Sequence, residues 1–284
     1  MFKTKLFIAI AAMGMSAAAS AAIDGSSSNG EFVFSAFDTV AGVGYTYELD
    51  DAGFDSLFGS DVRMNSLIGS TNTPTAVGFT LTQNVSGVVF DYALPSFTDF
   101  VSGANITTVK WNLAAADTSG LRRIIQTVTS APVSAPYTNA KLNESAASFS
   151  QYADAVNAKG TLATGADGFA LTSPTDMTAY AGNAPTMGVD FGTKGYANAG
   201  GLNDVLDIYV FGGTSSSSSS KADALYGALL DQTGNGLTAK VYMADDGMYH
   251  LQLAVAAVPE PSTYAMLLAG LGMLGFAARR ARRS

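Results

Sequence analysis

The sequence predicts a mainly β fold, a β-sandwich or jelly-roll-like packing of antiparallel sheets with one inserted helical segment. Three observations support this class. Apolar residues alternate with polar ones in several short runs, Gly, Asn and Asp residues separate these runs, and one mid-chain stretch has helical spacing instead. The chain has no cysteine, so an apolar core must hold the fold together without disulfide bonds.

Residues 1–22 have the pattern of a secretory signal peptide. Two lysines precede an apolar run, and small residues follow it, which places cleavage by signal peptidase after Ala21 or Ala22. The alternative, an N-terminal membrane anchor, requires a longer apolar run. We therefore expect a protein that is exported across the inner membrane, with an extracytoplasmic β-rich domain at residues 23–257.

Four β-hairpins are predicted along this domain, because each pair of β-rich runs is joined by turn residues. They join residues 30–40 to 43–50, residues 76–83 to 87–94, residues 106–117 to 121–129, and residues 237–244 to 248–255. The last hairpin has the strongest signal. Its Asp246-Gly247 pair is a favoured two-residue turn, since both central residues can take positive φ.

One amphipathic helix, or two short ones, is predicted over residues 139–160, with Gly160 as its stop. The apolar residues of this stretch recur at roughly helical spacing and are Leu142, Phe149, Tyr152 and Val156. Six consecutive serines at residues 215–220 predict a surface loop between elements.

The charge of the body is strongly acidic. The whole chain carries a formal net charge of −8, but without the signal peptide and tail nine basic residues face 22 acidic ones, a net of −13. Such a body repels phosphate, so the composition argues against nucleic acid as a partner. The charge also favours solubility after export.

The C-terminal segment, residues 258–284, begins with a Pro-Glu-Pro motif, which an uncharged apolar stretch follows closely. Pro259 and Pro261 bracket Glu260 and hold the backbone extended. Residues 264–278 then carry no charge, and as a helix they would span about 22 Å. That length is less than the roughly 30 Å hydrocarbon core, so we expect a short transmembrane helix that needs thinning of the bilayer or snorkelling of its flanking side chains.

An arginine-rich tail, residues 279–284, ends the chain. The positive-inside rule keeps this tail cytoplasmic and leaves the body outside; the basic residues are Arg279, Arg280, Arg282 and Arg283. A short helix with a motif on its outer side is typical of a temporary tether that an enzyme later cuts. The alternative is an ordinary single-pass anchor.

The order of these features resembles the PEP-CTERM sorting signal, whose signature tripeptide is matched by Pro259, Glu260 and Pro261. The resemblance implies cleavage by exosortase, a membrane transpeptidase-like enzyme, followed by release or transfer to the cell surface or extracellular matrix. It also implies an association with exopolysaccharide and biofilm. The stretches Glu31–Asp50 and Thr108–Val128 resemble the bodies of uncharacterised PEP-CTERM proteins.

His250 is the only histidine, so a serine–histidine–acid triad would have to use it. Alternate apolar residues from Tyr249 to Val255 form one strand face, so His250 and Gln252 are expected to face solvent. The chain also lacks the G-x-S-x-G motif of a nucleophile elbow. We expect no catalytic residue and no enzymatic activity.

Carboxylates are plentiful and leave two interpretations open. A glycosidase or lyase needs two acids facing each other across about 5 to 10 Å, which spacing in sequence does not assign. The acidic residues Asp50, Asp51 and Asp55, and the turn at residues 231–236, offer oxygen ligands for calcium. Neither stretch has the EF-hand pattern, so no metal ligand or cofactor is assigned and calcium is the one metal left open.

Five aromatic residues at strand period are candidates for stacking on sugars if they lie on an exposed face: Tyr45, Tyr47, Tyr92, Trp111 and Tyr249. Aromatic residues in such runs more often fill the core. We therefore expect a structural or adhesive surface protein of an exopolysaccharide-rich coat. The alternatives are a carbohydrate-binding module, which needs an exposed aromatic strip, and a carboxylate-dependent glycosidase or lyase, which needs an acid pair across a cleft.

Overall fold

The computed structural model describes residues 23, 30–53, 79–80, 87–162, 168–184, 186–192, 195–231 and 233–255. The predicted signal peptide, the sorting tail and its transmembrane helix lie outside these residues. Within them, no helix combines the length and the apolar character needed to cross a bilayer.

Strands dominate the described part of the chain. They are β1 (Glu31–Asp38), β2 (Val43–Gly53), β3 (Phe79–Thr80), β4 (Val88–Ala93), β5 (Lys110–Asp117), β6 (Arg123–Val128), β7 (Phe169–Thr172), β8 (Gly200–Gly201), β9 (Val205–Gly212), β10 (Leu225–Leu230), β11 (Leu237–Met243) and β12 (Tyr249–Val255). The helical elements are α2 (Phe97–Gly103), α3 (Asn139–Val156) and the 3₁₀ segment η4 (Pro174–Ala179). The prediction of a mainly β chain with an inserted helical segment is confirmed.

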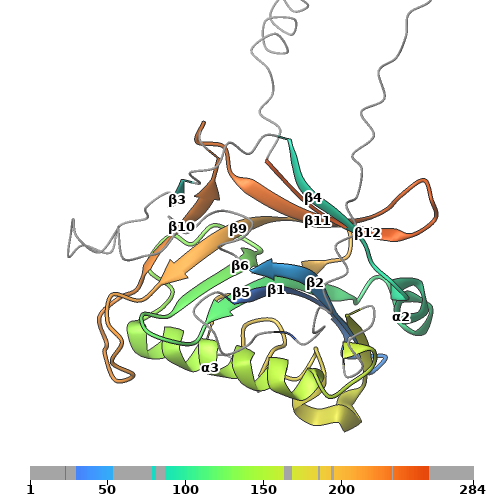
Figure 1. The fold of residues 1–284 in the computed structure, drawn as a ribbon, viewed down its shortest axis with the longest axis horizontal. Helices are drawn as coiled ribbons and strands as arrows, with labels where there is room; N and C mark the ends of the chain where they lie inside the picture. Colours follow the sequence, from blue (N-terminus) through green and yellow to red (C-terminus); the bar gives the residue numbers. More distant parts are fainter. Residues whose placement is uncertain are drawn as a thin grey trace, which may run out of the picture.

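The strands form one sheet whose main order is β4-β12-β11-β9-β6-β5-β1-β2-β7. Three further strands lie off this order: β10 pairs with β9 and with β3, and β8 pairs with β5. Among the described pairs only β10–β3 is parallel. The sheet curls, and strands from both of its halves share one apolar core (Figure 1). The antiparallel packing is thus confirmed, whereas a jelly-roll arrangement of two sheets is not.

Strand β9 is the point at which the sheet divides. Along one edge it pairs with β6 from Asp207 to Gly212. Along the other edge its first residues pair with β11, and its last residues, from Tyr209, pair with β10. The strands β4, β12 and β11, here called the terminal subsheet, therefore continue from the first part of β9 only.

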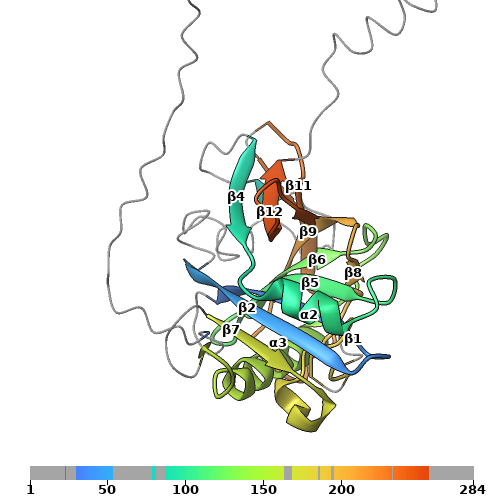
Figure 2. The same ribbon diagram turned by 90° about the vertical axis from the view of Figure 1, so that its right-hand side faces the viewer.

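The inner core lies on the concave side of the sheet and is rich in aromatic rings. Tyr45 and Phe97 meet edge to face with ring centroids 4.9 Å apart, and Phe34 lies 5.6 Å from Phe97. The α2 ring of Phe97 also meets Tyr249 at the start of β12, at 5.3 Å. Because α2 follows β4 directly, these contacts join the terminal subsheet to β1 and β2 (Figure 2).

The outer core lies between the opposite face of the sheet and α3. Thr138 caps the helix by accepting a hydrogen bond from the Lys141 backbone N–H. The predicted apolar stripe of Leu142, Phe149, Tyr152 and Val156 is fully buried against β1, β5 and β6. The Tyr152 hydroxyl bonds the side chains of Ser35 and Thr46. The helix prediction is confirmed, with an end at Val156 and Gly160 at φ 53° just beyond.

Three of the four predicted hairpins are confirmed: β1 with β2, β5 with β6, and β11 with β12. The prediction of a hairpin between residues 76–83 and 87–94 is wrong. Strand β3 pairs with β10, and β4 pairs with β12. Alternating apolar residues predicted each strand, but partner choice follows burial against distant strands, which the local pattern does not record.

The turn of the last hairpin also differs from the prediction. Ala244 N–H bonds Met248 O, which leaves the three residues Asp245, Asp246 and Gly247 in the loop. Gly247 has φ 81°, whereas Asp246 is not among the residues with positive φ. A three-residue loop of this kind needs only one left-handed position, so the predicted two-residue turn with two positive φ values is wrong.

Candidate functional site

The terminal subsheet carries a polar cluster on the face opposite the inner core. In β12, Leu251 and Leu253 are fully buried, so the intervening His250 and Gln252 point to the other face. Gln252 lies opposite Asp91 of β4. His250 lies opposite Tyr242 of β11 in the other direction. Strand register therefore gathers these side chains from three strands.

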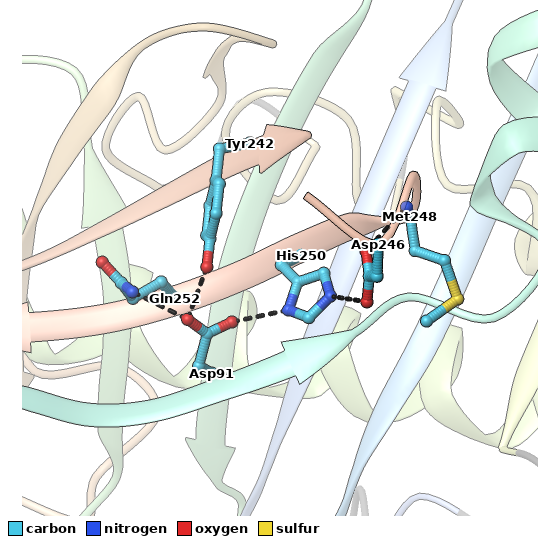
Figure 3. Close-up of polar contacts among 6 residues, drawn as sticks. All are labelled: Asp91, Tyr242, Asp246, Met248, His250 and Gln252. Atoms are coloured by element: carbon cyan, nitrogen blue, oxygen red, sulfur yellow. Dashed lines mark hydrogen bonds and ion pairs between the residues drawn. The ribbon is translucent and has the colours of Figure 1, made fainter. Parts of the chain in front are cut away.

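The cluster centres on the Asp91 carboxylate and the His250 ring (Figure 3). His250 Nδ1 lies 2.8 Å from Asp91 Oδ1, and His250 Nε2 lies 3.0 Å from Asp246 Oδ2. The other oxygen of Asp91 accepts hydrogen bonds from Tyr242 Oη at 2.6 Å and from Gln252 Nε2 at 2.7 Å. Every polar atom of the His250 ring is thus directed at a carboxylate.

The turn holds Asp246 in place for this contact. Asp246 Oδ1 accepts a hydrogen bond from the Met248 backbone N–H at 2.9 Å, which leaves Oδ2 for the His250 ring (Figure 3). The side chain of His250 is only 17% exposed, against 45% for Asp246. The cluster is therefore a partly shielded network at the surface, and the prediction that His250 points away from the core is confirmed.

The electrostatics favour a charged network. Burial opposes protonation of His250, but hydrogen bonds and charge attraction from Asp91 and Asp246 outweigh it and raise the pKa of the imidazole. Burial likewise opposes ionisation of Asp91, yet hydrogen bonds from Tyr242, His250 and Gln252 lower the pKa of its carboxyl. The bond to Asp91 raises the pKa of Tyr242 to about 12. The two carboxylates thus stabilise the imidazolium form relative to its stability in a free imidazole.

These hydrogen bonds hold the three strands of the terminal subsheet together. Asp91 of edge strand β4 is bound to β12 through His250 and Gln252 and to β11 through Tyr242. Both ring nitrogens of His250 are engaged by carboxylates, so the imidazole is positioned as a bridging cation. Nothing among these contacts provides a nucleophile for a serine triad.

Sequence reasoning identified His250 but missed its partners. Asp91 lies 159 positions from His250 along the chain, so no local spacing brings them together. Asp246 is four positions away and lay within the predicted turn, but its contact depends on the loop geometry around Gly247. Predicting the cluster would have required knowing that β4 pairs with β12.

The predicted carboxylate and calcium candidates do not form a metal site in the described part of the chain. No group of three or more acidic or histidine side chains there is arranged to hold an ion. The side chains of Asp50, Asp51 and Asp55 lie outside the described residues. Asp231 is buried, and its carboxylate accepts hydrogen bonds from Thr233 and Asn235 of its own turn. This stretch therefore forms a self-contained turn.

The aromatic candidates for sugar stacking all contribute to the inner core. Tyr45 and Trp111 are fully buried, and Trp111 Nε1 donates to Gly201 O at 2.7 Å. Tyr47, Tyr92 and Tyr249 are half-buried and pack against the same core. None of the large hydrophobic residues that are exposed in the described chain is aromatic. An aromatic strip for stacking on sugars is thus not present on these strands.

A second feature of the subsheet is the way it ends. Strand β12 stays paired to its last residue, with Leu237 opposite Val255 and Val255 N–H bonding Gly87 O at 2.8 Å. The predicted sorting motif at Pro259–Pro261 follows a few residues later. The chain thus joins an antiparallel β body directly to a tail with a motif, an apolar stretch and a basic end, the organisation of an exported protein with a C-terminal sorting segment.

Comparison with known families identifies that segment. The model of the PEP-CTERM protein-sorting motif matches residues 257–283. The match includes Pro259, Glu260 and Pro261, the expected helix at 264–278 and the four arginines named above. The chain thus carries a PEP-CTERM sorting signal and is an exosortase-targeted protein with transient membrane anchoring and extracellular placement. No significant match to a curated protein or to a solved structure was found.

Proposed function

We propose that this protein is a non-enzymatic structural or adhesive component of an exopolysaccharide-rich surface coat or biofilm matrix, delivered there by exosortase. The observation that carries the proposal is the sorting motif at residues 257–283. Signal peptidase is the expected partner at the N-terminus and exosortase at the C-terminus. Exopolysaccharide is the proposed partner of the body after release.

The body supports this proposal through its chemistry. The only histidine bridges two carboxylates within a strand-joining network. The acidic surface charge, −13 for the body, suits a soluble matrix component that repels nucleic acid and other polyanions. Contacts with a neutral or basic polysaccharide would then use polar side chains, since the aromatic candidates are occupied in the core.

The experiment that tests sorting is the intact mass of the protein recovered from cells with and without exosortase. We expect enzyme-containing cells to yield a body that lacks the apolar stretch and the arginines, with any residual mass identifying the acceptor. Recovery of a chain that runs to Ser284 in both strains would show an ordinary anchor instead. The coat role is then tested by comparing matrix retention of the processed protein in cells with and without exopolysaccharide.

A further inference from the structure

The folded body lies very close to the point of processing. Strand β12 is hydrogen-bonded through Val255, and only residues 256–258 separate that residue from Pro259. A fully extended chain spans at most about 14 Å over this distance. A body of roughly 230 residues has a radius of gyration of about 17 Å, so the tether is shorter than the body that it holds.

The described residues of β4, β11 and β12 at the end of the terminal subsheet next to this tether are uncharged. This end consists of the first residues of β4 and β11 and the last residues of β12, here called the tail-proximal end: Val88, Val89, Leu237, Thr238, Ala254 and Val255. Val88 is 53% exposed on it. Two carboxylates border this end. Asp231 accepts hydrogen bonds within its own turn, and exposed Asp207 of β9 lies directly opposite Thr238, on the side of β11 away from β12 and Val88.

The other end of the same strands is acidic. Asp245 and Asp246 occupy the β11–β12 turn, and Asp91 lies between the two ends, opposite Gln252 in the middle of β12. Another protein surface can cover an uncharged patch with an exposed valine at little cost in desolvation of charge.

We propose that the tail-proximal end is the surface that contacts exosortase when the enzyme binds the Pro-Glu-Pro motif. The inference rests on the function proposed above. An enzyme that surrounds the motif and lies within about 14 Å of Val255 must meet the end of the sheet, since the tether is too short to hold the body away. Val88 is the exposed large apolar residue of this end, so a charge placed there tests the contact directly.

The test is the rate of processing in cells that contain exosortase, followed by mass after a pulse of synthesis. Val88→Glu places a negative charge on the proposed contact. Val40→Glu is the matched control, because Val40 is 79% exposed in the β1–β2 turn, which Figure 2 shows on the far side of the molecule from the start of β4. A third variant combines Val88→Glu with a flexible Gly-Ser spacer inserted after Ala256.

We expect Val88→Glu to be processed several-fold more slowly than the natural chain, Val40→Glu to be unaffected, and the spacer to restore the rate. Thermal unfolding of each purified body verifies that the substitutions leave the fold intact. Processing of Val88→Glu at the natural rate, equal slowing by Val40→Glu, or slow processing that the spacer leaves unchanged would each overturn the contact. Absence of processing in the natural chain would instead refute the sorting function itself.

Discussion

His250 and Asp91 together join the three strands of the terminal subsheet: His250 lies on β12, Asp91 lies on β4, and Asp91 also bonds Tyr242 on β11. Strand β12 places His250 on the polar face, and the two neighbouring carboxylates convert a surface imidazole into a bridge between Asp91 and Asp246. Tyr242 and Lys240 complete the surroundings, with the Lys240 ammonium 4.8 Å from the centre of the Tyr242 ring. The charge of the cluster therefore changes with pH through a small, identifiable set of groups.

The first prediction concerns the pH dependence of stability. The pKa of His250 is raised in the folded state, so its contribution is complete below the unfolded value of about 6.5 and is lost as pH rises through the folded value. The pKa values of Asp91 and Asp246 are lowered, so their contributions are present above the ordinary carboxyl range and are lost as pH falls through the folded values.

The cluster should thus stabilise the subsheet most in mildly acidic solution. Replacement of the imidazole, His250→Gln, is expected to lower the unfolding temperature most below the unfolded imidazole value of about 6.5 and progressively less as pH rises through the higher folded value. Thermal unfolding of both proteins across that range measures the difference. A gap between them that stays constant with pH would show that the ring contributes through packing alone.

The sequence correctly predicted the side of the sheet to which His250 points. Alternation along β12 assigned His250 to the side away from the core, and the structure agrees, because side-chain direction in a strand follows from position alone. Its two partners depend on a long-range strand pairing and on a loop conformation. Those are properties of the whole packed sheet, and they were not predicted.

At the scale of elements, the β11–β12 turn depends on one glycine. Gly247 has φ 81° and no atom within 4 Å of an added Cβ, so a substitution there is strained only through its backbone. Gly247→Ala is expected to destabilise the body by about 1 kcal/mol, and Gly247→Asn by less, because Asn tolerates the left-handed region better. Urea unfolding of the three proteins gives the order, and equal stability of all three would refute it.

The local hairpins and the helix were predictable because their signals are contained in short segments. The β1–β2 and β5–β6 pairs follow from alternation interrupted by turn residues, and α3 follows from the spacing of residues such as Phe149 and Tyr152. The partner of β4 was mispredicted because a short apolar strand next to a turn does not specify which edge it will join. Burial of Phe90 against Leu253 across β12 decides that choice.

At the scale of the molecule, the two cores draw on described residues from Ile23 to Leu253, all of which precede the sorting segment. A mature body ending at Ala257 is therefore expected to unfold at the same temperature as the processed protein from cells. A chain ending at Met248 is the contrasting variant. It lacks Leu251 and Leu253 from the inner core and should show no cooperative unfolding transition.

Thermal scans of these purified bodies provide the measurement. A lower midpoint for the chain ending at Ala257 would mean that residues or an acceptor retained beyond Ala257 after processing contribute to the folded state. Cooperative unfolding of the chain ending at Met248 would mean that the terminal subsheet is not part of the main folding unit, contrary to the core that it shares with β1, β2 and α2.

The place of β12 in the sheet also determines how late in synthesis the sheet can be completed. Among the described strands it is the only partner of β4, yet it is the last to be synthesised, well over a hundred residues after β4. Strand β4 must therefore wait through most of secretion before it can be paired. Because only residues 256–258 separate β12 from the sorting motif, a chain that is exported from its N-terminus exposes together the strand that completes this sheet and the motif that the enzyme recognises.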